Sequence, residues 1–139
     1  VSNSTFSSNS AASGGGVWNG VGAVTVKNTI VANSPTGWTC SGTITDGGGN
    51  LSYPDTTCPG INVDPMLGPL QNNVGPTETM QLGPGSAAID TGMDAICAAT
   101  PVNGLDQRGI ARPWGPHCDI GAVEQVPIKK LWFPAARGQ

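Results

Sequence analysis

The second half of the chain is interrupted by paired Gly and Pro residues that leave only short apolar runs between them. Four such pairs occur, at residues 68–69, 75–76, 83–84 and 115–116. Gly and Pro favour turns and interrupt helices and strands. Apolar runs of this length are too short to show the periodicity of a helix. The sequence therefore predicts a compact, irregular β cap over residues 63–125.

The same stretch carries motifs that resemble the choice-of-anchor Q domain. The blocks that carry the resemblance are Asp64-Pro65 with Gly68-Pro69-Leu70, Gly75-Pro76-Thr77, Pro84-Gly85-Ser86-Ala87-Ala88-Ile89-Asp90, Asp106-Gln107-Arg108-Gly109 with Arg112-Pro113, and Cys118-Asp119-Ile120-Gly121-Ala122-Val123-Glu124. The resemblance implies a domain that closes the C-terminal end of a right-handed parallel β-helix in a secreted, adhesin-like bacterial surface protein. It implies a structural or surface-retention role and carries no catalytic motif onto this chain.

Residues 1–62 resemble the last coils of such a β-helix. The segment at residues 4–10 recurs at residues 28–34, an offset of 24 residues, which is about one coil of a β-solenoid. The repeat predicts that Phe6 stacks under Ile30 inside the coil and that Asn9 stacks under Asn33 at a corner. The fold class expected is all-β, a short right-handed parallel β-helix of two to three coils followed by the irregular cap.

One strand of the predicted coils shows a clear alternation. Val24 and Val26 alternate with Thr25 and Lys27. Because successive side chains of a strand point to opposite faces, the valines are expected in the core and Lys27 in water. Residues 35–42 and 53–60 are expected to be loops, and residues 126–139 a separate β-prone tail.

The four cysteines indicate an oxidising location. Four cysteines allow three pairings, and the sequence-local one joins Cys40 to Cys58 and Cys97 to Cys118. Each bridge would close a loop of roughly twenty residues and stabilise by about 3 kcal/mol in the chain-entropy model. Disulfides persist outside the cytosol, which agrees with an extracellular, bacterial cell-surface location.

Composition limits the partners. Only 11% of residues are charged, the net charge is -3 and the pI is about 4.7, so a nucleic-acid surface with clustered Lys and Arg is not expected. The sequence contains no apolar run long enough for a membrane span and no signal peptide. We therefore expect export to be directed by a segment outside this sequence.

The two ends of the coil stack are expected to differ. A solenoid end exposes unpaired strands, and the cap is expected to cover the C-terminal end while nothing covers the N-terminal end. The N-terminal end, with Val1 and Phe6, is therefore a candidate self-association surface. The tail supplies the other candidate residues, which are Ile128, Leu131, Trp132 and Phe133. This segment is expected either to dock on its own domain or to add as a strand to a neighbour.

Catalytic chemistry is not expected. The coils contain no acidic residue between Val1 and Asp46, so they offer no paired carboxylates for cleaving polysaccharides. The acidic and basic side chains of the cap are expected to form structural ion pairs that hold irregular loops. These residues are Asp90, Asp106, Arg108, Arg112 and Asp119.

Metal and cofactor sites are not expected either, with one exception. A calcium ion bound by Asp64, Asp90 or Asp119 together with backbone carbonyls is an open hypothesis, because irregular acidic loops suit hard cations. The single histidine, His117, lies beside a cysteine expected to be oxidised, so no zinc site is expected.

Two functions follow from these observations. The first is a non-catalytic extracellular module that self-associates head-to-tail into a filament, or that forms the anchor end of a longer surface protein. The second is a carbohydrate-binding or polysaccharide-active β-helix fragment, with Trp18 and Trp38 as sugar-stacking side chains.

Overall fold

The computed structural model describes residues 1–126, which are built almost entirely from short strands and turns. The strands are β1 (Thr5–Ser7), β2 (Val17–Val26), β3 (Ile30–Ala32), β4 (Cys40–Asp46), β5 (Leu51–Tyr53), β6 (Ile61–Asn62), β7 (Leu67–Gln71) and β8 (Thr79–Leu82). The helix found in this part of the chain, α1 (Asp94–Ala98), has five residues. The predicted all-β class is therefore confirmed.

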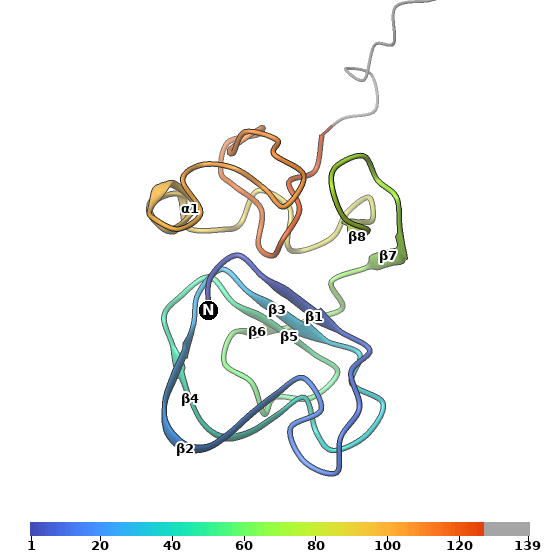
Figure 1. Ribbon diagram of the computed structural model, residues 1–139, viewed down its shortest axis with the longest axis vertical. Helices are drawn as coiled ribbons and strands as arrows, with labels where there is room; N and C mark the ends of the chain where they lie inside the picture. Colours follow the sequence, from blue (N-terminus) through green and yellow to red (C-terminus); the bar gives the residue numbers. More distant parts are fainter. Residues whose placement is uncertain (127–139) are drawn as a thin grey trace, which may run out of the picture.

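The first half of the chain winds in successive turns, which we call circuits, and strands of one circuit pair with strands of the next. One sheet has the order β1-β3-β5-β6 and a second consists of β2 and β4, and all of these pairs are parallel. In Figure 1 the circuits lie behind one another, with the four-stranded sheet on the side that faces the cap. Parallel neighbours need a crossover between them; the rest of a circuit provides it for β1–β3, β3–β5 and β2–β4, whereas β5 and β6 are joined by the loop at residues 54–60.

The register of these circuits differs from the prediction by one residue. Thr5 pairs with Ile30 and Phe6 with Val31, an offset of 25 residues for both pairs. The predicted stacking of Phe6 under Ile30 was therefore wrong, and so was the ladder of Asn9 under Asn33. Ser8 lies opposite Asn33 instead, and both have positive φ, at 58°.

A left-handed corner sets this register. Asn3 and Asn28 lie one circuit apart with φ of 45° and 43°, and their N–H groups donate to the carbonyls of Lys27 and Gly48. Asn adopts this region more readily than other residues with a side chain, and Gly49 takes the equivalent place in the next circuit with φ of 67°. Corner geometry, rather than matched apolar side chains, therefore aligns the circuits.

Strand β3 is buried on both faces. Val31 contacts Cys40 and Cys58 in the interior of the circuits, with Phe6 and Val17 packed against them. Its neighbours Ile30 and Ala32 point the other way and are fully buried. A continuous apolar run of this kind is typical of a strand covered on both sides. Elsewhere the alternation holds, with Val26 buried, Val24 half-buried and Lys27 exposed, as predicted.

The second half of the chain packs against the side of the stack. Leu82, Ala88 and Ile120 contact the outward-facing Ile30 and Leu51. The Gly121 N–H donates to the Asn28 carbonyl over 2.8 Å. Figure 1 shows α1, β7, β8 and their loops above the four-stranded sheet rather than at either end of the stack. The expectation that this region covers the C-terminal end was wrong, because the outer face of the sheet is apolar and needs the cover.

Candidate functional site

At the C-terminal end of the strand stack, the loop between β5 and β6 lies against the start of β4, and β6 is the edge strand of the four-stranded sheet. The disulfide Cys40–Cys58 ties this loop to the start of β4. The Asp55 carboxylate accepts the Thr39 N–H over 2.8 Å, and the Thr57 hydroxyl accepts the Cys40 N–H over 2.8 Å. These side chains satisfy backbone groups at the start of β4 that a further strand would otherwise pair.

The four-stranded sheet has two edge strands, β1 and β6, and β1 lies at its N-terminal end. Strand β1 pairs only with β3, and the ladder between them uses the Ser4 carbonyl and the Ser8 N–H. Because consecutive residues of a strand direct their N–H groups to opposite sides, Thr5 and Ser7 direct theirs away from β3. No hydrogen bond within residues 1–126 uses the N–H of Thr5 or Ser7. β1 is therefore an unpaired edge strand.

A groove follows this open edge. One cavity of about 650 Å³ lies between residues 3–6 of the first circuit and residues 101–107 of the cap. A second cavity of about 250 Å³ continues along residues 5–9, with β7 and β8 on its far side. The two cavities share Thr5, Gln107 and Ala122, so they form one groove, which we call the β1 groove.

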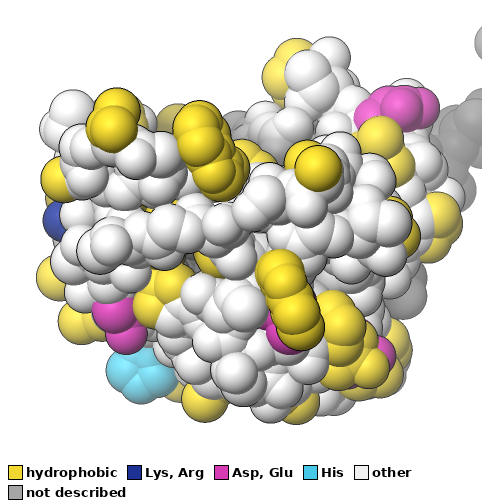
Figure 2. Space-filling view, turned by 90° about the horizontal axis from the view of Figure 1, so that it is seen from below, with side chains coloured by type: hydrophobic (Ala, Val, Ile, Leu, Met, Phe, Trp, Pro, Cys, Tyr) yellow, Lys and Arg dark blue, Asp and Glu magenta, His cyan; other side chains and the backbone are white. Residues whose placement is uncertain are grey.

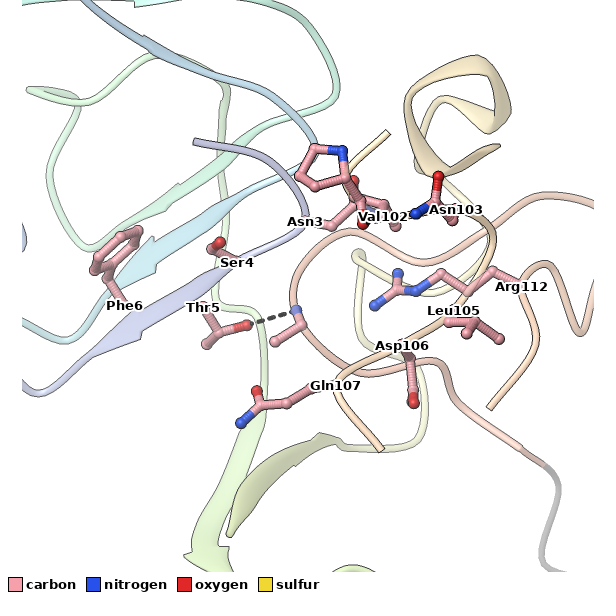
Figure 3. A pocket seen from close by; sticks show the side chains of 12 residues that line it. Asn3, Ser4, Thr5, Phe6, Val102, Asn103, Leu105, Asp106, Gln107 and Arg112 are labelled. Atoms are coloured by element: carbon pink, nitrogen blue, oxygen red, sulfur yellow. Dashed lines mark hydrogen bonds between the residues drawn. The ribbon is translucent and has the colours of Figure 1, made fainter. Parts of the chain in front are cut away.

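Figure 3 shows how the walls of the β1 groove are held together. The Thr5 hydroxyl accepts the Ala122 N–H over 3.0 Å, and this contact joins the strand to the cap. Phe6 projects from β1 on the side away from Thr5, toward the interior of the circuits. On the cap side, Leu70 and Leu105 are 57% and 49% exposed. The groove therefore offers unpaired backbone along one wall and exposed apolar side chains along the other.

A buried charge cluster supports the cap beside the groove. The Arg112 side chain, 1% exposed, donates to the carbonyls of Asp119 and Gly121 and lies 3.6 Å from the Glu124 carboxylate. Burial lowers the pKa of Arg112, and burial raises the pKa of Asp119 and of Glu124 despite the hydrogen bonds each carboxylate accepts. The cluster fixes the segment that contacts the sheet.

The predicted ion-pair residues are only partly brought together. Arg108 pairs with Asp106 over 2.8 Å. Arg112 takes Glu124 as its ion-pair partner and reaches Asp119 through the backbone carbonyl. Asp90 contributes its N–H, which donates to the Asp119 carboxylate over 2.7 Å. Sequence reasoning missed the role of Glu124, since partners on separate irregular loops leave no spacing signal.

The carboxylates proposed for calcium are engaged in local hydrogen bonds. Both oxygens of Asp119 accept backbone N–H groups, from Asp90 and Gln125, and the Asp64 carboxylate accepts the Met66 N–H. Within residues 1–126, no three His, Cys, Asp or Glu side chains gather as a metal site would require. The calcium hypothesis stays a prediction, tested by the melting temperature in EDTA.

The second predicted disulfide lies beside a buried amide. Cys97 is bonded to Cys118, and the Asn28 side-chain amide donates to the sulfur of Cys97 over 3.3 Å. The same amide donates to the Met93 carbonyl over 3.0 Å. Both predicted pairings are thus confirmed, and this bridge belongs to the contact between cap and stack.

The two tryptophans proposed for sugar stacking are both exposed. Trp18, in β2, is 65% exposed and Trp38, in the loop before β4, is 67% exposed. Figure 2 views the molecule from below, where hydrophobic side chains form separate groups among uncharged polar surface. The Trp18 ring covers Gly20, where an added Cβ would meet the ring at 2.3 Å.

The predicted self-association residues fall into two groups. Phe6 packs half-buried at the open end, and Val1 is exposed beside it, with its amino group bonded to the Thr25 carbonyl over 2.8 Å. The remaining four, Ile128, Leu131, Trp132 and Phe133, lie outside the described residues. The sequence predicted the open end, whereas the groove depends on where the cap packs and carries no sequence signal.

Comparisons with known proteins found no relative, so the site is interpreted from its own geometry. No protein-family model, curated protein or solved structure matches the chain. No helix within residues 1–126 has the length and hydropathy needed to cross a membrane. Two disulfides are compatible with an extracellular location.

Proposed function

We propose that this chain is a non-catalytic structural module of the bacterial cell surface that self-associates head-to-tail. In this proposal the stacked circuits are coils of a right-handed parallel β-helix, and residues 63–125 form a cap related to the choice-of-anchor Q domain. The same module would serve as the anchor end of a longer surface protein where more coils precede it.

The spacing of the parallel strands supports the β-helix. Residues one circuit apart pair in register, with 25 residues from Thr5 to Ile30 and 21 from Ile30 to Leu51. The interior apolar side chains of the circuits pack against those of neighbouring circuits, as in solenoid repeats, while Ile30 and Leu51 are covered by the cap.

The unpaired edge of β1 beside a groove is the observation that carries self-association. Near Cys58 the side chains of Asp55 and Thr57 satisfy backbone groups at the start of β4; β1 and β6 are both edge strands of the four-stranded sheet, and β1 is the one that lies along the β1 groove. An open strand edge is a template for pairing with another chain. A contact that joins two different surfaces produces a ring when its rotation closes and a filament when it does not, and we propose the filament.

Sedimentation velocity and negative-stain imaging of the full chain test this proposal. We expect sedimentation coefficients that rise with protein concentration, together with unbranched filaments one molecule wide. A single monomeric boundary at every concentration, from micromolar to millimolar, would contradict self-association. Closed rings of fixed size would contradict the open head-to-tail geometry.

Carbohydrate binding is the second candidate, and the exposed indoles of Trp18 and Trp38 favour it. An exposed aromatic ring can stack on a sugar face. A screen against bacterial and plant glycans, with calcium present, tests this function. Binding that the Trp18→Ala variant loses would support it, and retention of binding by that variant would exclude Trp18 from the site.

A further inference from the structure

We infer that the β1 groove is the acceptor of an extended strand and that the donor is the segment Ile128–Phe133 of a second copy of this chain. The inference rests on the proposed self-association and names the two surfaces that make it. It is argued from the shape of the groove, the placement of its apolar side chains and the distribution of charge.

The groove runs along β1. It follows the first circuit from Asn3 to Asn9, where β1 (Thr5–Ser7) is extended over about 10 Å at about 3.3 Å per residue and the chain turns at Asn3 and Ser8, which have positive φ. Ile128–Phe133 contributes six residues between two prolines. Part of that segment would pair along β1, where the outward N–H and C=O groups of Thr5 and Ser7 supply ladder partners, and the rest would continue along the groove.

The groove has two apolar sides, and so does the donor sequence. An added strand would meet Leu105 and Leu70 of the cap on one face and continue the row of Phe6 on the other. Strands buried on both faces carry apolar residues at odd and even positions alike. In an extended donor, Ile128 and Trp132 would share one face with Lys130, while Leu131 and Phe133 would share the other with Lys129.

Charge favours this donor over other segments. Residues 1–126 contain nine acidic and three basic side chains, a formal charge of -6. Residues 127–139 contain no acidic residue and the remaining three basic ones, which gives +3 and matches the net charge of -3 for the whole chain. Glu78 lines the groove. Opposite charges of this size speed encounter and orient docking.

Two full-length variants separate the acceptor from the donor. The acceptor-defective variant is Ser7→Pro, which removes the outward N–H and places a ring in the groove. Proline is tolerated on an edge strand where its N–H would face solvent, so the fold is expected to persist. The donor-defective variant carries Leu131→Pro with Trp132→Pro, which removes N–H groups on both sides of the segment.

Each variant alone is expected to sediment as a monomer, while an equimolar mixture forms a one-to-one dimer and nothing larger. The dimer forms because one partner keeps an intact donor and the other an intact groove. The matched control is Ser7→Val, which keeps the N–H and should assemble like the unmodified chain. Circular dichroism and intact disulfides establish that each variant is folded.

The outcomes distinguish this inference from the proposed function. If the donor-defective variant forms the same filaments as the unmodified chain, the inference is overturned while self-association stands. If the unmodified chain is monomeric, self-association fails. Slow hydrogen exchange at Thr5 and Ser7 in that monomer would place the donor in its own groove and overturn the assignment to a second copy.

Discussion

Asp55 is the residue that ties the loop between β5 and β6 to the circuit before it. Its carboxylate accepts hydrogen bonds from the backbone and hydroxyl of Thr39 and from the backbone and hydroxyl of Thr57. The Asp55→Asn variant keeps the shape but replaces a charged acceptor with a neutral amide. We expect the free energy of unfolding at pH 7 to fall by about 1–3 kcal/mol, measured by urea denaturation.

The same residue makes a pH prediction. Burial raises the pKa of Asp55, but the hydrogen bonds from Thr57 and Thr39 outweigh burial, so its pKa is lowered in the folded protein. A lowered folded pKa gives stability that is present above the unfolded pKa of about 3.9 and is lost as the pH falls through the folded value. The difference between wild type and Asp55→Asn should therefore shrink below about pH 4. A constant difference down to pH 2 would assign the loss to packing instead.

Gly121 lies in close contact with the sheet where the cap packs on it. Its φ is +99°, and an added Cβ would meet the Thr5 hydroxyl at 2.7 Å and Ile30 at 2.8 Å. The Gly121→Ala variant should lose about 1–3 kcal/mol of unfolding free energy through backbone strain and overpacking. Gly109→Ala is the control, because Gly109 has φ of +83° and open space around it. Equal losses in the two variants would show that only backbone strain matters.

At the scale of elements, the Cys97–Cys118 bridge holds α1 to the segment that reaches the sheet. The bridge spans 21 residues of sequence, and Cys97 is buried. The double variant Cys97→Ala with Cys118→Ala should lose about 3 kcal/mol of unfolding free energy. Hydrogen exchange should accelerate at the Gly121 N–H before it accelerates in β3. Uniform acceleration through cap and stack would show that the cap is not a separate unit.

The strands and the disulfides were predictable because their signals are local. Alternating Val24 and Val26 gave the core face of β2, and the shortest cysteine spacings gave both bridges. The register was not predictable from apolar matching, since Phe6 and Ile30 look equivalent while the Asn3 and Asn28 corners align the circuits.

The sequence of β3 carries a signal for where the cap packs, but this signal is ambiguous. Ile30, Val31 and Ala32 form a continuous apolar run, which indicates burial on both faces of a strand. The cap could cover either the outer face of this sheet or the end of the stack. The sequence does not distinguish between these two positions. The β1 groove could not be predicted, because its walls come from segments about one hundred residues apart.

At the scale of the whole molecule, the separation of charge predicts how assembly responds to salt. Residues 1–126 have a formal charge of -6 and residues 127–139 a formal charge of +3. If each of the three basic side chains of residues 127–139 formed one exposed ion pair in the assembly, at about 0.2–1 kcal/mol each, together they would account for about a tenfold change in the dissociation constant. Raising the salt from about 0.01 M to about 1 M shortens the Debye length from about 30 Å to about 3 Å. We expect the dissociation constant, measured by sedimentation equilibrium, to rise about tenfold over this range.

The direction of the salt effect distinguishes two ways of joining the ends. Assembly through bare apolar coils would be insensitive to sodium chloride or strengthened by it, because burial of apolar surface carries no charge to screen. Assembly through the basic segment weakens as salt rises. The variant Lys129→Gln with Lys130→Gln should bind more weakly at low salt and lose most of the salt dependence. A wild-type constant that stays flat across the range would remove residues 127–139 from the interface.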